Sequence, residues 1–412
     1  MLASVSGYQM FRVAQVWLVY EITGSPLYLG YAAAANALPG IFFNLVGGVI
    51  ADKVDKRRLV QTTQAASGGL IILLATLTIQ DVVQVWHILV IAFLAGAVEA
   101  FDNPARQALY PHLIERRVMT SAVAMNSVIW QSTRIVAPAV AGVIIDLINT
   151  AASFYLAGLG FLTMATVMHF LTVPHIAAGT RSNPVTDLLE GLNYVRKNSI
   201  FSFLIGMTFF NSFFGMAYVF LMPVFAVDIL EVGAKGQGLL LGISGVGSLL
   251  VTLWLGSRSN VRHRGLLIIG GAVMFGLTLA AFAATTQYIG LFSLAMTLMF
   301  FMGIFNSAYS ISIQSSLQMM VPDGIRGRVM GFYAMTWSIM PLGGTQAGAL
   351  ANIIGAPFAI MIGGLAVACF AVGPALINRQ VRNLGTTLRQ AELAAASGGS
   401  RPQSVPSGAN DG

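Results

Sequence analysis

Long apolar segments recur along the whole chain and are separated by short polar stretches. A helix needs about 20 mostly apolar residues to cross the hydrocarbon core of a bilayer, and the segments reach that length. The pattern predicts twelve membrane-spanning helices, at residues 3–22, 27–51, 59–80, 84–107, 120–146, 150–172, 199–227, 237–257, 265–285, 288–316, 328–351 and 355–377. The fold class is therefore expected to be an all-α membrane protein.

Composition agrees with this prediction. Hydrophobic residues make up 56% of the chain, whereas a soluble domain is about 45 to 50% apolar. The net charge of +7 is spread between the predicted spans and is not gathered on a soluble face, so nucleic acid is not an expected partner. The single cysteine, Cys369, lies in an apolar segment and suggests neither a disulfide nor a metal site.

Enzyme chemistry is not expected from the motifs. The chain has no phosphate-binding loop of the G-x-x-x-x-G-K-[ST] type, so direct use of ATP by this chain is disfavoured. No cluster of His, Asp or Ser at catalytic spacing falls in a loop. We therefore predict no cofactor and no metal.

The basic residues between spans fall almost entirely on one side of the predicted membrane. If the loop after the second span is cytoplasmic, the opposite side holds only Lys235. Positive charge favours the cytoplasmic side of a membrane, so both termini are predicted to be cytoplasmic. The cytoplasmic set is Lys53, Lys56, Arg57, Arg58, Arg106, Arg116, Arg117, Arg181, Arg196, Lys197, Arg258, Arg262, Arg264, Arg326, Arg328, Arg379, Arg382, Arg389 and Arg401.

A polar stretch divides the chain into two parts with six predicted spans each. We expect an N-terminal bundle at 1–172, a cytoplasmic linker at 173–198, a C-terminal bundle at 199–378 and a largely disordered cytoplasmic tail at 379–412. The stretches PHLIERRVM (111–119) and PDGIRGRVM (322–330) repeat each other in the two parts. Such repetition is expected when two helix bundles surround a central path.

The first predicted span begins almost at Met1, without a polar arm before it. A secretory signal peptide is not expected, because a basic leading segment and a small-residue cleavage site are missing. A start codon assigned late, or a natural truncation, would explain a first helix that is shortened.

The loop between the second and third spans is unusually charged. In GGVIADKVDKRR (47–58), the residues Gly48, Asp52, Lys53, Lys56 and Arg57 resemble the loop signature of the major facilitator superfamily, with Asp55 where that pattern has Gly. WLVYEITGSPLYLG (17–30), FDNPARQALYPHL (101–113) and PAVAG (138–142) are similar to the branch that includes bacterial enterobactin and macrolide exporters. The resemblance implies two pseudo-symmetric six-helix bundles, a monomer, and a place in the bacterial inner (plasma) membrane.

Two interpretations of this loop stay open. The bases alone would fix the topology of the membrane protein. The acids offer compensating partners, and the resemblance implies a gating loop that latches one of two conformations and releases in the other. That predicted gating loop consists of Gly48, Asp52, Lys53, Lys56, Arg57 and Arg58.

Ionisable residues inside spans are costly and are functional candidates by default. Arg12 contacts an anionic substrate, pairs with an acid such as Glu21 or Glu99, or reaches out of the membrane from the end of a truncated helix. Glu99 and Asp102 are three residues apart and share a helix face, so Glu99 is either a proton carrier or part of a structural ion pair.

Two further arginines complete the set predicted to serve in charge relay or proton coupling. Arg106 lies four residues after Asp102, near the cytoplasmic end, where the pair is expected to form a relay with Arg57 or Arg58. A substrate site is the alternative for this pair. Arg134 lies in the middle of the fifth span, one turn before Pro138.

Two stretches predict close helix packing. RIVAPAVAG, which contains Pro138 and Gly142, resembles the superfamily's antiporter motif, which limits leakage through a closed cavity. PLGGTQAG, with Pro341, Gly344 and Gly348, is its counterpart in the eleventh span, where small residues recur at four-residue spacing. Ordinary helix packing is the alternative for both.

We predict a secondary transporter, with protons as the coupling ion, that exports a small amphipathic compound such as a siderophore, an antibiotic or a drug by alternating access. The export direction rests on the resemblance. The alternatives are a lipid or lysophospholipid flippase, with membrane lipids as partners, and a non-transporting membrane sensor on the same fold. Residues expected to line the path are Gln15, Trp17, Asn36, Asn126, Trp130, Asn211, Phe214, Asn306, Gln314 and Trp337.

Overall fold

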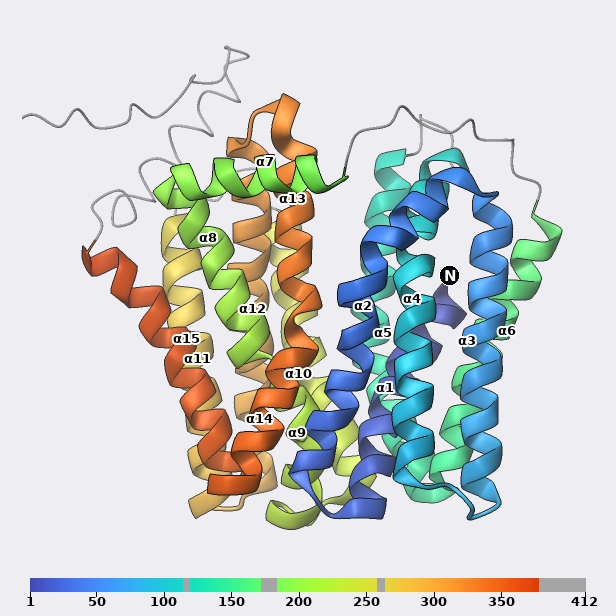
Figure 1. The fold of residues 1–412 in the computed structure, drawn as a ribbon. Coiled ribbons are helices and arrows are strands. Elements are labelled where there is room, and N and C mark those ends of the chain that lie inside the picture. Colours follow the sequence, from blue (N-terminus) through green and yellow to red (C-terminus); the bar gives the residue numbers. More distant parts are fainter. Residues whose placement is uncertain (114–118, 172–183, 258–263, 378–412) are drawn as a thin grey trace, which may run out of the picture.

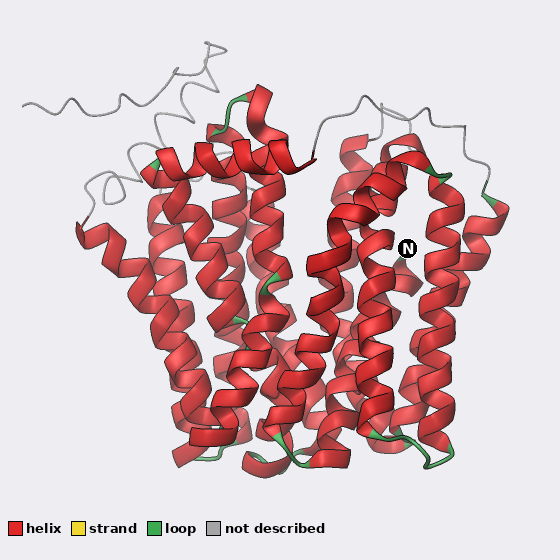
Figure 2. Cartoon of the chain, viewed as in Figure 1, coloured by secondary structure: helices red, strands yellow, loops and turns green. Residues whose placement is uncertain are grey.

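The computed structural model describes residues 1–113, 119–171, 184–257 and 264–377, and Figure 2 shows that these residues form helices joined by short loops. The helices of the first half are α1 (Leu2–Thr23), α2 (Pro26–Lys53), α3 (Lys56–Ile79), α4 (Val85–Leu113), α5 (Met119–Leu147) and α6 (Thr150–Phe170). A separate helix, α7 (Pro184–Lys197), lies across one end of the second half (Figure 1).

The second half begins with a span made of four short pieces, α8 (Ser199–Phe210), η2 (Asn211–Gly215), α9 (Tyr218–Val224) and η3 (Phe225–Ile229). It continues with α10 (Gly233–Gly256), α11 (Arg264–Tyr288), α12 (Phe292–Met320), α13 (Asp323–Ser338), α14 (Met340–Ile354) and α15 (Ala356–Ile377). The chain therefore runs back and forth six times in each half, as the hydropathy pattern predicts.

Within the described ranges, nine helical segments are long and apolar enough to cross a membrane. The remaining three of the twelve predicted spans are α1, α2 and the pair α13 and α14, which run alongside the nine (Figure 1). Length does not set the first helix apart, since α1 has 22 residues, α6 has 21 and α15 has 22.

Two predicted spans differ from the helices found. The span predicted at 199–227 contains two π-helical turns, at Asn211–Gly215 and Phe225–Ile229. The span predicted at 328–351 begins earlier, at Asp323, and is broken at Ile339 because Pro341, which has no N–H to donate and clashes with the preceding turn, starts a new helix. Hydropathy reports neither change, because the apolar character continues through both.

The two halves meet through backbone contacts at glycines. A Cβ atom on Gly142 of α5 would lie 2.4 Å from the carbonyl oxygen of Ala234 and 3.0 Å from the Cα atom of Gly238, both on α10. The lower ends of α2 and α14 lie side by side in Figure 1, at the end of the molecule away from α7. Glycine permits this approach because a side chain on either helix would separate the backbones.

Candidate functional site

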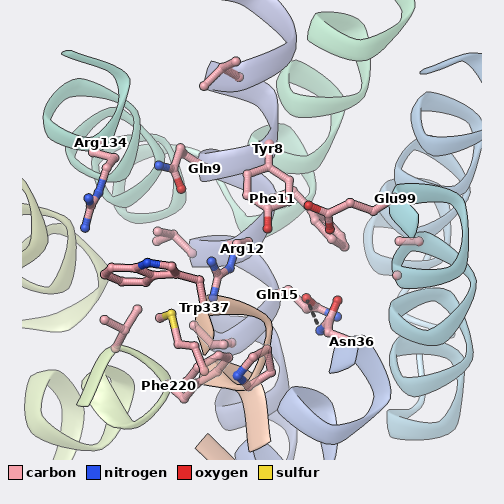
Figure 3. Close-up of a pocket in the computed structure, with 18 of the residues that line it drawn as sticks. Tyr8, Gln9, Phe11, Arg12, Gln15, Asn36, Glu99, Arg134, Phe220 and Trp337 are labelled. Atoms are coloured by element: carbon pink, nitrogen blue, oxygen red, sulfur yellow. Dashed lines mark hydrogen bonds between the residues drawn. The ribbon is translucent and has the colours of Figure 1, made fainter. Parts of the chain in front are cut away.

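A cavity of about 530 Å³ lies between the two halves and receives side chains from both. Its volume falls within the range of about 300 to 1,000 Å³ that suits a drug-sized ligand. Figure 3 shows charged, amide and aromatic groups pointing into the same space from several helices. The charged residues at its wall are Arg12, Glu99, Asp102, Arg106 and Arg134.

Arg12 projects from α1 into this cavity. Its guanidinium carbon lies 5.8 Å from the centre of the Tyr8 ring and 5.5 Å from the centre of the Phe220 ring. Tyr8 precedes Arg12 by one helical turn, whereas Phe220 belongs to α9 in the other half. Arg12 therefore bridges the halves through cation–π contacts, which stabilise a guanidinium at membrane depth.

Glu99 of α4 faces the same space (Figure 3) and interacts electrostatically with Arg12 and Tyr8. Of the two acids predicted as counter-ions for Arg12, this is the one that the structure brings near it. The other acid, Glu21, lies at the far end of α1 and accepts a hydrogen bond from Thr150 Oγ1 at 3.1 Å. The proposed proton-carrying role of Glu99 stays a prediction.

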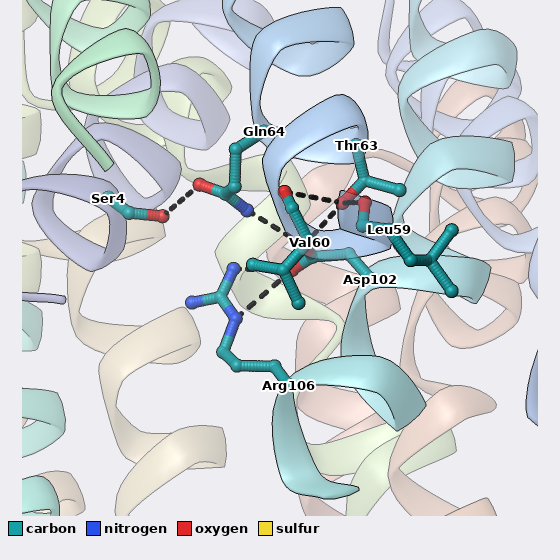
Figure 4. A network of polar contacts seen from close by, with 7 residues as sticks. All are labelled: Ser4, Leu59, Val60, Thr63, Gln64, Asp102 and Arg106. Carbon is teal, nitrogen blue, oxygen red and sulfur yellow. Dashed lines mark hydrogen bonds and ion pairs between the residues drawn. The ribbon is translucent and has the colours of Figure 1, made fainter. Parts of the chain in front are cut away.

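Asp102 lies one turn further along α4 and is held by a buried polar network (Figure 4). Its Oδ1 atom accepts hydrogen bonds from Thr63 Oγ1 at 2.7 Å and from Gln64 Nε2 at 3.0 Å. Its Oδ2 atom forms an ion pair with Arg106, and Ser4 Oγ donates to Gln64 Oε1 at 2.6 Å. The network ties α1, α3 and α4 together, so Asp102 is locked in place while Glu99 faces the cavity.

The charged loop connects α2 directly to α3. Asp55, which stands where the family pattern has Gly, is the N-cap of α3 and accepts a hydrogen bond from the backbone N–H of Arg58 at 3.0 Å. This hydrogen bond satisfies one of the N–H groups at the start of the helix that have no partner within the helix. Asp55 was expected only to compensate the charge of the neighbouring bases. Gly48 lies in α2, and the side chains of Asp52 and Lys53 are outside the described residues.

Arg57 and Lys56 are placed by the start of α3. Lys56 is buried, and Arg57 Nε donates to the backbone oxygen of Met168 at 2.7 Å while its Nη2 donates to that of His169. The described contacts thus take Arg57 to the C-terminal end of α6, whereas the relay was predicted to join Asp102 and Arg106 to Arg57 or Arg58. A cation stabilises a helix at that end because its last carbonyls carry partial negative charge.

Arg134 of α5 borders the cavity beside Trp130 and Trp337. It keeps accessible surface because its side chain faces open space inside the protein. Within the described part of the chain, its guanidinium makes no hydrogen bond or ion pair. Figure 3 shows it apart from Glu99, with Arg12 between the two.

The predicted packing residues lie at the contact between the halves. Pro138 lies inside α5, and its carbonyl oxygen is 2.5 Å from where a Cβ atom on Gly238 would be. A Cβ atom on Gly344 would lie 2.5 Å from the ring of Phe220. Pro341 lies in the first turn of α14, where a missing N–H costs little. Their role in limiting leakage stays a prediction.

Several predicted lining residues do face the cavities. Gln15, Asn36, Trp130, Asn306 and Trp337 border the main cavity, and Gln314 borders a second one. The other expected residues, Trp17, Asn126, Asn211 and Phe214, are absent from both linings.

Sequence reasoning did not find Tyr8, Tyr218, Phe220 and Ser244, which border the main cavity. For Tyr8 a signal existed, because it precedes Arg12 by four residues and shares its helix face. The other three lie in the second half, and their place near Arg12 depends on how the halves dock.

The family model described as a transmembrane secretion effector of the major facilitator type matches residues 1–393. The chain belongs to the major facilitator superfamily. It is 25% identical over 373 residues to the staphyloferrin A transporter of Staphylococcus aureus, covering 89% of this chain and 91% of that protein. It is 24% identical over 388 residues to macrolide efflux protein A of Streptococcus pyogenes, covering 91% and 93%.

A third relative is the enterobactin exporter EntS of Salmonella typhimurium, 22% identical over 340 residues, with 81% of this chain and 75% of that protein covered. Among solved structures, a bacterial homologue of the lysosomal transporter Spinster in an inward-facing conformation has a TM-score of 0.67 at 13% identity, covering 96% of this chain and 93% of that chain. The inward-open xylose transporter XylE from E. coli has a TM-score of 0.65 at 12% identity, covering 90% and 94%.

These findings confirm the predicted fold and the predicted class of protein. The structural similarities, at identities this low, speak for the fold alone. The family match makes the chain a multi-pass membrane transporter and not an enzyme. Two of its relatives are named for the small molecules that they move, staphyloferrin A and macrolides.

Proposed function

We propose that this transporter is an exporter in the bacterial cell membrane that uses a proton gradient to extrude a small amphipathic compound by alternating access. One observation carries the proposal: charged groups from the membrane-spanning helices face a cavity that both halves line. Charges are costly at that depth and are retained where they bind substrate or ions. The export direction is taken from the relatives named for efflux and export.

The glycine contacts supply a seam that can open and close. Gly142 packs against α10, and Gly348 packs against α2, both at the end away from α7. Backbone contacts without side chains between them can separate as rigid surfaces. In the proposed cycle this seam parts when the cavity opens toward the outside, with residues 1–172 and 199–378 moving as two bundles.

The orientation in this proposal follows the basic residues. The end that carries α7 is placed in the cytoplasm, together with both termini, the linker 173–198 and the tail 379–412. The Arg57 contact with α6 then lies on the cytoplasmic side. In this orientation the contact between Gly30 and Gly348 lies near the outer surface of the membrane.

Glu99 is the proposed proton carrier. It faces the cavity beside Arg12, whereas Asp102 is fixed by Thr63, Gln64 and Arg106. A carboxyl group that carries a proton must be reachable by water. It can drive a conformational change only if its charge attracts a neighbouring group, and that attraction is lost when it is protonated. Protonation of Glu99 would weaken its attraction to Arg12, and Arg12 contacts Phe220 of the other half. This links protonation to the interface between the halves.

The test uses everted membrane vesicles that are acid inside. A catecholate siderophore, a macrolide and a lysophospholipid are added in turn while a dye reports internal pH. Proton release on one compound is expected, and Glu99→Gln is expected to abolish it. Asp81→Asn is the matched control, because Asp81 is an exposed acid in the loop between α3 and α4 and does not line the cavity.

Two outcomes would contradict the proposal. If none of the three compounds caused proton release although folded protein was present in the vesicles, the sensor alternative would be favoured. Lysophospholipid movement without proton release would move it to a flippase. Equal proton release by wild type and Glu99→Gln would remove Glu99 as the carrier while leaving antiport in place.

A further inference from the structure

The charges that the described residues bring to the main cavity do not balance. Of these residues, three arginines (Arg12, Arg106 and Arg134) and two acids (Glu99 and Asp102) lie at its wall, which leaves one positive charge in excess. If Glu99 carries a proton, the excess grows. An uncompensated cation at membrane depth is costly, and such groups are retained for a ligand or a counter-charge.

The position of the excess charge follows from the pairs. Asp102 is paired with Arg106, and Glu99 is the acid that interacts with Arg12. Arg134 remains, with no ion pair or hydrogen bond from any residue that the structure describes. Arg12 and Arg134 are also close enough to repel each other. A negative group placed between them would be attracted by both.

Arg134 also stands between two cavities. The second cavity, of about 440 Å³, shares Arg134, Asn306 and Trp337 with the first. The other polar side chains that the described part of the chain brings to its wall are amides and hydroxyls, namely Gln131, Ser307, Ser310, Gln314 and Tyr333. The buried Ser310 hydroxyl has no partner in the described structure. Neutral polar groups around a lone guanidinium favour a hydrated or hydroxyl-bearing anion and offer nothing that would neutralise a cation.

We propose that Arg134 binds a carboxylate group of the transported compound, and that the preferred substrates are organic anions with an aromatic or apolar part. The guanidinium fork matches a carboxylate with two parallel N–H···O bonds. Trp130 and Trp337 border the cavity beside it and offer flat apolar surfaces for the rest of the molecule. The inference rests on the proposed function, because it takes this cavity as the transport site.

The proposal distinguishes anionic, neutral and cationic compounds, whereas the names of the relatives do not indicate which charge is preferred. A basic amine would meet the excess positive charge of Arg134 and Arg12, and at least a tenfold weaker binding is expected for it than for a matched carboxylate, equivalent to about 1.4 kcal/mol. A neutral compound of the same apolar shape is expected to lie between the two.

The experiment measures binding of three fluorescent probes with one shared aromatic group to the purified full chain in lipid nanodiscs. The probes are dansyl-glutamate, which is anionic, dansylamide, which is neutral, and dansylcadaverine, which is cationic. Dansyl-glutamate is expected to bind most tightly. Arg134→Gln is expected to weaken its binding about tenfold or more, Arg134→Lys to weaken it less, and both to leave dansylamide within about twofold of wild type.

Arg196→Gln is the matched control, since Arg196 is an exposed arginine on α7 and lines neither cavity. It removes the same charge from the protein and is expected to change no probe. Three results would overturn the proposal: dansyl-glutamate failing to bind the wild type, dansylcadaverine binding as tightly as dansyl-glutamate, or Arg134→Gln weakening dansylamide as much as dansyl-glutamate. The last result would show that Arg134 only supports the shape of the cavity.

Failure here is distinct from failure of the exporter proposal. If a carboxylate bound at Arg134 but no compound showed proton-linked transport, the anion site would be supported and proton antiport would be contradicted. Proton-linked export of a macrolide without carboxylate binding would do the reverse.

Discussion

A Cβ atom on Gly348 would lie 2.8 Å from the Cα atom of Gly30, so the backbones of α14 and α2 touch across the two halves of the protein. Real Cβ atoms are not found at such distances from another backbone. The contact closes the end away from α7 (Figure 1), and it exists only because both positions are glycine.

The first prediction is that Gly348→Val opens this seam. A branched side chain cannot fit against Gly30, so α2 and α14 must separate, and transport is expected to fall about tenfold or more because one state of the cycle is lost. Spin labels on Ile148→Cys and Lys235→Cys, in a Cys369→Ser background, report the distance between the halves at this end. The distance is expected to increase.

The control for that change is Gly69→Val, which places the same side chain on an exposed glycine of α3 with open space around it. Both variants carry the same cost of a β-branched residue in a helix. If the two variants gave the same label distances and the same transport rate, close packing at Gly348 would not matter to the cycle.

A second prediction concerns Tyr20 and Asp228. The Tyr20 hydroxyl of α1 donates a hydrogen bond to Asp228 Oδ2 of η3, which belongs to the other half. Tyr20→Phe removes that bond and is expected to shift the balance toward the state open at this end by about 1 kcal/mol, or roughly fivefold. The same label pair measures the shift. Unchanged populations would show that the bond forms without favouring either state.

A third prediction separates two neighbouring arginines. Arg57 donates to two carbonyl oxygens at the end of α6, whereas the side chain of Arg58 is exposed. Arg57→Ala is expected to lower the free energy of unfolding in detergent by about 1.5 kcal/mol, and Arg58→Ala by less than about 0.5 kcal/mol. Denaturant titration of both variants measures this. Equal losses would mean that these bases act through topology alone.

A fourth prediction tests the Asp102 network. Asp102→Asn leaves Arg106 without its ion-pair partner in a largely buried place, and is expected to lower stability by about 3 kcal/mol. The second change, Arg106→Met, removes the unpaired charge, so the double variant is expected to recover part of the loss. Denaturant titration of the two single variants and the double variant completes the cycle. Additive losses would contradict direct coupling between the two residues.

Much of the fold was predictable because a bilayer imposes a simple rule. A segment that crosses the hydrocarbon core must be apolar and must satisfy its own backbone hydrogen bonds, so hydropathy located the twelve spans to within a few residues. The rule is silent about helix interiors. It therefore missed the π-helical turn at Asn211–Gly215 and the break at Ile339, which leave hydropathy unchanged.

The candidate site was predictable only in part. The cost of a charge in the membrane identified Arg12, Glu99 and Arg134 from the sequence, and helical spacing placed Asp102 and Arg106 together. Spacing within one helix cannot report partners on another. For this reason the contact of Arg57 with α6 was not foreseen, and neither was the N-cap role of Asp55. The predicted relay of Asp102 and Arg106 with Arg57 or Arg58 stays a prediction.

By itself, the sequence determined that this protein is a helical membrane transporter built of two related halves, because apolar length, charge bias and the loop motif are local properties of the chain. Only the tertiary structure decided that Phe220 covers Arg12 and that Asp102 is fixed while Glu99 faces the cavity. It also decided that Arg134 has no ion-pair partner among the residues described. These relations depend on how separate helices, several of them from opposite halves, pack against one another. Residue spacing within a single helix shows which side chains share a face, but it does not show which residues of another helix they meet.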